Sequence, residues 1–312
     1  MRRDLLFEIG TEELPARFIE PALESLKNYT LTKLNTLEIP FEDLKVAGTC
    51  RRLTLFLKGL AEKQKDKEEE ILGPSLKVAL DEQGNFTQAL IGFAKKNEIS
   101  LTDLYIKETS KGKYFCAKKI IPGQWVSELL PNLLIDILQK IYFPKKMRWG
   151  NFDFSFARPI KWLLALFGSE VIPIERAGIK SNKFTKGHRF LSKEKLQVDI
   201  ADWDFYKNLL HSHYVILEVE ERKAYTRKTI EELSKSYGKV IIEESLLDEN
   251  ANLVEFPFPI IGKFPEKFLN LPEKLVITAL QEHQRYFYLV DENNRLLPYF
   301  IAVNNNKPVD ER

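Results

Sequence analysis

The stretch LLFEIGTEELPA, residues 5–16, sets the first two elements of the chain. Leu5 to Ile9 is a short apolar run that predicts a strand, and Gly10 permits a sharp turn after it. Thr11 is a candidate helix cap, and the proline near the end of the stretch is tolerated only in the first turn of a helix. Leucines then recur at helical spacing, so we expect an amphipathic helix over about 15–37.

Two adjacent carboxylates, Glu12 and Glu13, lie inside this stretch and allow two interpretations. A catalytic pair needs facing geometry and separated pKa values, which adjacent residues at a helix start rarely provide. The alternative is that both residues lie at the positive end of the helix, where a carboxylate is stabilised. We favour the helix-start interpretation.

The composition indicates a soluble globular protein with material for large cores. The chain has 312 residues, of which 44% are hydrophobic, and this length suggests two domains, possibly three. No run approaches the ~18 to 20 apolar residues of a membrane span, and the start does not resemble a secretory signal, so we expect a cytoplasmic protein without membrane contact. The two cysteines, Cys50 and Cys116, exclude a disulfide framework.

The net charge of +2 hides a local excess of positive charge. Residues 145–195 carry twelve Lys and Arg against four Asp and Glu, an excess of eight. Such a patch suits a polyanion such as RNA, because each phosphate contact by a basic residue releases counterions. A solvated basic surface is the competing interpretation.

Two clusters within this segment are candidates for RNA binding. In PKKMRWG, cations surround a tryptophan on which a base could stack. In TKGHRF, a glycine lets the backbone bend, and we expect the polar side chains to project from a loop. The tryptophan is alternatively a core anchor, and Arg189 alternatively pairs with a carboxylate such as Glu194. The candidates are Lys145, Lys146, Arg148, Trp149, Lys186, His188 and Arg189.

The pattern of elements predicts an α+β fold rather than a doubly wound sheet. We expect a first α+β domain over 1–150 and a second over 151–312, because regular periodicity stops near 143–159. The expected helices lie near 85–97, 126–141, 202–212, 220–238 and 244–256, and the expected strands near 45–62, 104–121, 162–168, 171–179, 196–200, 214–219, 286–291 and 299–303.

Common catalytic motifs are missing. The sequence has neither GxxxxGK[ST] nor GxGxxG, and it has no GxSxG elbow. His211 and His213 straddle a serine at a helix end with no obvious third ligand, so we expect no metal site. We therefore predict no catalytic residue and no cofactor in this chain.

Several uncommon strings follow one another along the chain. They are FEIGTEELPA, RRLTLFL, GPS at 73–75, KKMRWG, RPIKWLLALFG, TKGHRF, LVEFPFPIIGKFPEKFL and LQEHQRYF followed by LLPYFIAVNN. This ordered set resembles the beta subunit of bacterial tetrameric glycyl-tRNA synthetase from Leu6 to about Asn304. The chain departs slightly from that family at Cys50, where proline is common, and at Arg285, where lysine is common.

The resemblance implies a divided enzyme. In the family, a separate alpha subunit activates glycine with ATP and Mg, and the beta subunit helps to bind tRNA(Gly) within an alpha2 beta2 heterotetramer. The family's HD-type and anticodon-binding domains are absent from this sequence, which resembles an N-terminal fragment. The later half also resembles, more remotely, the editing-like domain of the phenylalanyl-tRNA synthetase beta chain.

Three functions remain open at this point. The first is a noncatalytic module that supports tRNA binding and subunit assembly. The second is a hydrolase that removes the amino acid from mischarged tRNA. An enzyme specific for glycine can exclude larger amino acids by size, so a second, size-based editing site has little use. The third is an assembly scaffold whose basic segment has no partner.

Overall fold

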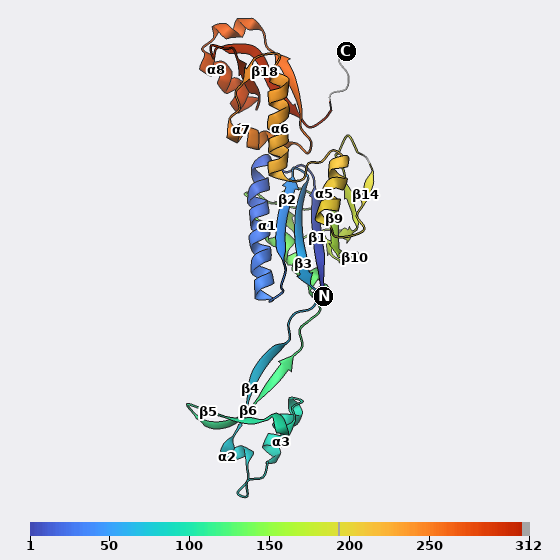
Figure 1. Cartoon of the computed structure of the whole chain (residues 1–312), viewed down its shortest axis with the longest axis vertical. Helices are drawn as coiled ribbons and strands as arrows, with labels where there is room; N and C mark the ends of the chain where they lie inside the picture. The colour runs from blue at the N-terminus through green and yellow to red at the C-terminus, as the bar shows by residue number, and fades with distance from the viewer. Residues whose placement is uncertain (193, 308–312) are drawn as a thin grey trace. The chain divides into compact units, whose positions relative to one another are not determined.

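The computed structural model describes residues 1–192 and 194–307. Contacts divide the chain into two compact units, Met1–Glu62 with Ser127–Arg312, and the inserted unit Lys63–Val126 (Figure 1). This differs from the division expected at residue 150. The reason is that a strand beyond residue 150 pairs directly with the first strand of the chain, which no local pattern reveals.

The larger unit is built on a seven-stranded sheet. Its order is β11-β12-β9-β1-β3-β2, with β10 paired to β9. The pairs are antiparallel except for β12 with β9. The strands are β1 (Arg2–Thr11), β2 (Asp43–Thr49), β3 (Arg52–Ala61), β9 (Ile160–Phe167), β10 (Glu170–Val171), β11 (Glu175–Arg176) and β12 (Ile179–Asn182).

The strand β1 is central because its apolar run is buried on both faces. Leu5, Leu6, Phe7 and Ile9 are all 0% exposed. Leu6 joins a core cluster with side chains of β3, β9 and the helix α5 (Trp203–Ser212). Since successive strand residues point to opposite faces, Leu5 and Phe7 face the other side of the sheet. The expected strand at the start of the chain is confirmed.

The long first helix, α1 (Ala16–Thr36), confirms the helix expected over 15–37. It runs beside β2 and β3 (Figure 1). Its outer flank meets α4 (Val126–Lys140), where the Tyr29 hydroxyl donates to Asp136 at 2.8 Å and Lys33 pairs with the same carboxylate at 2.6 Å. Phe18 also contacts Phe143, with ring centroids 6.3 Å apart.

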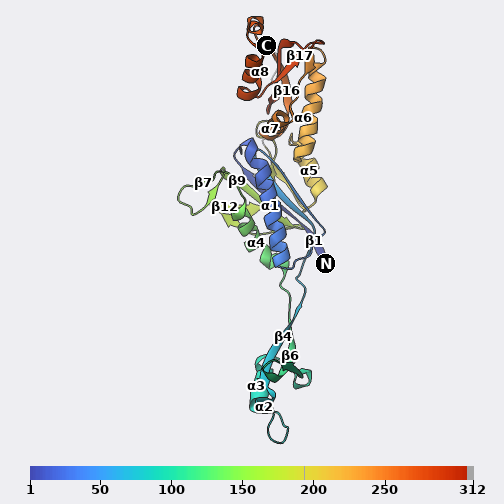
Figure 2. The ribbon, with the colours of Figure 1, turned by 90° about the vertical axis from the view of Figure 1, so that its left-hand side faces the viewer.

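A second sheet of four antiparallel strands, ordered β15-β17-β18-β16, follows in the same unit. Its core includes side chains of α6 and α7, and in Figure 2 α8 lies on the side of the strands away from α6. Its elements are α6 (Val219–Ser234), β15 (Lys239–Val240), α7 (Glu244–Leu253), β16 (Phe258–Lys263), the 3-10 helix η2 (Glu266–Asn270), α8 (Glu273–Thr278), the π-helix η3 (Ala279–His283), β17 (Phe287–Val290) and β18 (Leu296–Asn304).

The strand expected over 214–219 is wrong, because the chain there has no strand pairing. A buried guanidinium holds this segment instead. Arg222 donates to the carbonyl oxygens of Ile216 at 2.7 Å and Ala251 at 2.6 Å. Burial lowers the pKa of Arg222 to about 10. The apolar side chains Val215 and Leu217 fill the core from an irregular segment, which explains the misleading pattern.

Two short strand pairs complete the larger unit. The strands β7 (Met147–Arg148) and β8 (Ser155–Phe156) form one pair, and β13 (Phe184–Lys186) and β14 (Lys195–Gln197) form the other. Both pairs lie within residues 147–197 and overlap the basic segment 145–195. Of the candidate residues, β7 carries Arg148 and β13 carries Lys186.

The inserted unit has a three-stranded antiparallel sheet, β4-β6-β5, around a small core of its own. The hairpin expected over 104–121 is confirmed, with Thr109 opposite Gly112. The KEEE run, residues 67–70, is exposed and forms the beginning of β4. The elements are β4 (Lys67–Ser75), α2 (Leu76–Ala79), α3 (Gln88–Lys96), the 3-10 helix η1 (Leu101–Asp103), β5 (Tyr105–Thr109) and β6 (Gly112–Ile121).

The close packing of Trp162 against Gly10 generates a stability prediction. A Cβ added at Gly10 would lie 1.9 Å from Cε2 of the Trp162 indole. Gly10→Ala must displace this buried ring, and we expect a loss of about 1–3 kcal/mol in the free energy of unfolding. Gly92→Ala, where no atom lies within 4 Å of the added Cβ, is the control. Urea unfolding that is unchanged by Gly10→Ala would contradict the close packing.

Candidate nucleic-acid interface

A buried ionic network lies beneath the basic segment. Arg52, Glu8 and Glu255 are each 0% exposed. The Arg52 guanidinium donates to Oε1 of Glu255 from Nε at 3.2 Å and from Nη2 at 3.0 Å, and Nη1 approaches Glu8 at 3.5 Å. One cation therefore joins two carboxylates that lie far apart in the sequence.

Neutral donors complete the environment of both carboxylates. Glu8 accepts hydrogen bonds from Trp162 Nε1 at 2.7 Å, the Tyr206 hydroxyl at 2.7 Å and the Thr185 hydroxyl at 2.8 Å. Glu255 accepts from the Thr49 hydroxyl at 2.9 Å. These bonds replace the water that burial removes, which is the condition for retaining a charge in the interior.

The ionic partners keep the buried groups charged. Burial raises the pKa of Glu255, but Arg52 and Arg51 outweigh burial and hold the pKa below its ordinary value. For Arg52, burial lowers the pKa, and Glu255 and Glu8 reverse that effect, so the net pKa is raised. Burial and the neighbouring Glu8 raise the pKa of Tyr206 well above the usual range, which keeps the phenol protonated as a donor.

Sequence reasoning missed this network, although a signal was present. Each member lies within or directly beside an apolar run: Glu8 within LLFEIG, Glu255 within LVEFPF, and Arg52 directly before LTLFL. An unpaired charge in a buried strand is costly, so charges at such positions indicate partners elsewhere in the chain. The partners themselves are decided by sheet pairing.

The helix-start interpretation of Glu12 and Glu13 is wrong. The helix α1 begins at Ala16 with no acidic residue in its first turn, and Thr11 ends β1 instead of capping α1. Glu12 instead pairs with Lys161 at 3.0 Å. The hydrogen bond from Lys161 is the largest cause that lowers the pKa of Glu12.

Arg189 is exposed and pairs with carboxylates, but its partners are Glu12 at 3.4 Å and Glu13 at 3.2 Å instead of Glu194. The two glutamates thus form surface ion pairs with basic side chains. Neither carboxylate shows the environment of a catalytic pair, since each is engaged with a cation. An anionic ligand at Arg189 has to compete with these pairs.

The His188 side chain is buried and does not project from its loop as expected, being 0% exposed. Its Nδ1 accepts from the backbone N–H groups of Phe190 at 3.2 Å and Leu191 at 3.3 Å. The other ring nitrogen, Nε2, therefore carries the proton and donates to Asn305 Oδ1 at 3.0 Å. The ring shapes the loop and offers no free nitrogen to a ligand.

The first cluster lies at the start of the β7–β8 hairpin. Lys145 and Arg148 are exposed, and Arg148 Nε donates to the carbonyl oxygen of Phe152 at 3.3 Å. Lys146 is half-buried near the Phe143 ring, and burial followed by the nearby Lys140 lowers its pKa. Trp149 is also half-buried, so it is not a fully enclosed core anchor.

The second cluster surrounds another indole. Lys186 Nζ lies 5.3 Å from the ring centroid of Trp162, and this ring is bonded to the buried Glu8. Within the described residues, no hydrogen bond or ion pair joins Lys145, Lys146 or Arg148 to Lys186 or Arg189. Whether both clusters contact one ligand therefore remains a prediction.

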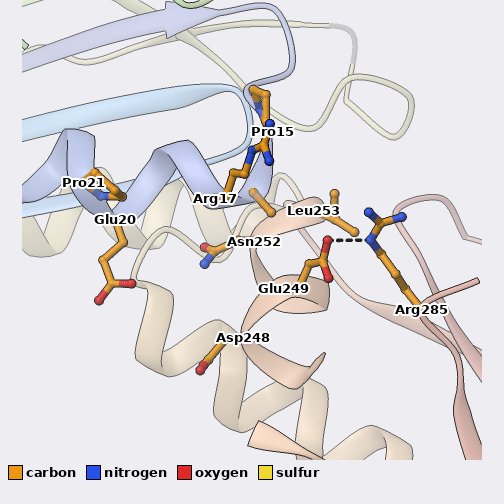
Figure 3. A pocket seen from close by; sticks show the side chains of 10 residues that line it. Pro15, Arg17, Glu20, Pro21, Asp248, Glu249, Asn252, Leu253 and Arg285 are labelled. Carbon is orange, nitrogen blue, oxygen red and sulfur yellow. Dashed lines mark hydrogen bonds and ion pairs between the residues drawn. The ribbon is translucent and has the colours of Figure 1, made fainter. Parts of the chain in front are cut away.

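A separate pocket of about 780 Å³ lies where the first turns of α1 meet α7 (Figure 3). Arg285, which has a left-handed backbone with φ of 58°, pairs there with Glu249. None of the candidate residues lines this pocket. Its lining is Pro15, Ala16, Arg17, Glu20, Pro21, Asp248, Glu249, Asn252, Leu253 and Arg285.

Among the residues that the structure describes, no group of three or more His, Cys, Asp or Glu side chains is arranged to hold a metal ion. No helix in that part of the chain is both long and apolar enough to cross a membrane. Cys50 and Cys116 are both buried and unbonded.

The fold and the site define a mixed helix and sheet protein in which a buried ionic network underlies a surface rich in basic side chains. Its sequence matches the glycyl-tRNA synthetase beta subunit family over residues 5–312, and the chain belongs to that family. The resemblance stated from the sequence is confirmed.

Individual relatives agree with this assignment. The glycine–tRNA ligase beta subunit of Halalkalibacterium halodurans is 45% identical over 305 residues, which is 97% of this chain and 43% of the relative. The subunit of the same name from Halothermothrix orenii is 42% identical, covering 98% of this chain and 44% of the relative. That of Bacillus subtilis is 41% identical, with 97% and 44% covered. The chain thus spans less than half the length of these relatives.

The buried network yields a prediction with a pH signature. Glu255→Gln removes a charge that faces Arg52 and Arg51, and we expect it to lower the free energy of unfolding by about 3–5 kcal/mol at pH 7. Because the folded-state pKa of Glu255 lies below its ordinary value of 4.5, this contribution is complete above that pH. It is lost as the pH falls through the folded-state pKa.

The measurement is urea unfolding of both proteins from pH 7 to pH 3. The difference between them should shrink at the acidic end, because the wild-type carboxylate is then protonated. Glu24→Gln, on the exposed face of α1, is the matched control and should change stability by less than about 0.5 kcal/mol. A difference that is independent of pH would contradict a charged Glu255.

Proposed function

We propose that this chain is a noncatalytic portion of the beta subunit of glycine–tRNA ligase, and that it supports tRNA binding and subunit assembly. The observation that carries the proposal is the family match along nearly the whole chain. The missing nucleotide motif supports a division of labour in which an alpha subunit, with ATP and Mg, activates glycine and transfers it to tRNA(Gly). The assembly would be a cytoplasmic alpha2 beta2 heterotetramer.

The candidate RNA contacts come from the two basic clusters. Lys145, Lys146 and Arg148 offer phosphate contacts, and the half-buried Trp149 offers a stacking surface beside them. Lys186 and Arg189 supply the second cluster. We assign His188 an indirect part, because its buried ring holds the loop that carries Arg189.

An editing hydrolase is less well supported. We propose that the later half resembles an editing-like domain in its fold, and we propose no editing activity for it. The ring of His188, the polar group that suggested a hydrolytic pocket, is buried with both nitrogens engaged. It therefore lacks the free base that water activation needs. A scaffold without RNA contact would be favoured only if the basic substitutions tested below left tRNA affinity and its salt slope unchanged.

Glycine-dependent ATP–pyrophosphate exchange tests the noncatalytic assignment. We expect no exchange from the purified chain alone, because it carries no nucleotide motif. Exchange should appear when the alpha subunit is added. Robust glycine-dependent exchange by the chain alone, copurifying with it through two unrelated chromatographic steps, would overturn the assignment.

A salt series of tRNA affinity tests the RNA contacts. We expect Lys146→Ala and Arg189→Ala each to reduce the slope of log affinity against log salt by roughly 0.7 to 0.9, as the loss of one phosphate contact does. Trp149→Ala should weaken binding without changing the slope, because stacking releases no counterions. Circular dichroism checks folding. Unchanged affinity and slope in both basic variants would instead indicate a solvated surface or a subunit interface.

A further inference from the structure

The indole of Trp162 is surrounded by cations. The guanidinium carbons of Arg51 and Arg52 lie 5.8 Å and 5.6 Å from its ring centroid, and Lys186 Nζ lies at 5.3 Å. The ring is itself fixed, because it packs on Gly10 and its Nε1 donates to Glu8. Three positive groups are therefore held around one immobile side chain.

The nearby carboxylates do not balance these cations. Glu8 and Glu255 face three positive groups, and their oxygens already accept bonds from Arg52 and from neutral donors. At the surface, Glu12 is committed to Lys161 and Arg189. The cluster around the indole keeps an excess of one positive charge.

Two groups in this cluster have unused binding capacity. Arg51 is only 7% exposed, and its Nε has no hydrogen-bond partner. Its one ion pair with a described residue is a 3.4 Å contact from Nη1 to Glu255. Lys186 has no carboxylate within ion-pair distance among the described residues. Burial lowers the pKa of Lys186, and the nearby cations Arg51, Lys161 and Lys195 lower it further, against a small opposing effect of Glu12.

We propose that Lys186 and Arg51 form a phosphate-binding site beside Trp162, with Lys186 as the accessible contact. An ammonium supplies a compact charge and a guanidinium supplies directional donors, the combination that suits a phosphate group. A phosphate group with one negative charge, such as a backbone phosphodiester, would offset the excess positive charge and accept a hydrogen bond from Lys186, the more exposed of the two groups. The inference deepens the proposed function, on which it rests for one source of phosphate, the backbone of tRNA.

The two sources of phosphate, RNA and a small phosphate compound, are separated by titrating Lys186 itself. Lysine residues of the full chain are labelled by reductive methylation with carbon-13, and the Lys186 signal is assigned by its loss in Lys186→Met. Its pKa is measured alone, with tRNA and with inorganic phosphate, at ionic strength matched by chloride. A bound phosphate stabilises the charged lysine, so we expect the pKa to rise with the ligand that binds.

A rise with tRNA supports the site and its RNA source. A rise with inorganic phosphate alone supports a small-molecule phosphate site and removes Lys186 from the RNA surface, even where tRNA binds elsewhere on the chain. If neither ligand moves the pKa, the site is overturned. That result leaves the proposed function standing whenever wild-type tRNA binding is intact.

Matched variants supply an independent measurement. With RNA as the source, Lys186→Met should reduce the salt slope of tRNA affinity by about 0.7 to 0.9, and Lys186→Arg should restore it. Lys183→Met is the control, because Lys183 is a lysine of the same segment, half-buried like Lys186, that pairs with Asp199. An equal loss of slope in Lys183→Met and Lys186→Met would show that the slope depends only on the net charge of the segment. That result would overturn a specific phosphate contact at Lys186.

Discussion

The bond of Arg52 to two buried carboxylates is the interaction on which the larger unit depends. Arg52 begins β3, Glu8 lies within β1, and Glu255 follows α7. Removing one partner from such a group leaves an uncompensated buried charge, which costs about 3–5 kcal/mol. The network therefore favours the one arrangement in which the first sheet and the segment after α7 meet.

The same network determines what the surface presents. Asn305 Oδ1 accepts from the backbone N–H of Glu255 at 2.8 Å and from the ring of His188 at 3.0 Å. The loop that carries Arg189 is thereby tied to the backbone beside a buried carboxylate. Trp162, held by Glu8, likewise supports Lys186 from below. A basic surface that rests on fixed groups loses little entropy when a ligand binds, which is the advantage of preorganisation.

The inserted unit has a different physical origin. Its hairpin and its α3 helix depend on contacts between residues close in sequence, and both were predictable from period and turn residues. Its core is small, with Ala79, Leu90 and Phe115 as the buried members. Several large apolar side chains of this unit, including Ile120 and Trp125, remain exposed. The division at residues 63 and 126 has no comparable local signal.

The sequence by itself determined the strand and helix of the opening stretch, the mixed helix and sheet architecture, the local excess of basic charge and the family. These properties follow from periodicity, composition and the order of short strings, which are all readable along the chain. Only the tertiary structure decided that Glu12 and Glu13 clamp Lys161 and Arg189, that His188 is buried, and that 214–219 is not a strand. The physical reason is that ion pairs, burial and strand pairing join residues far apart in sequence, and each charge gives no local sign of its partner.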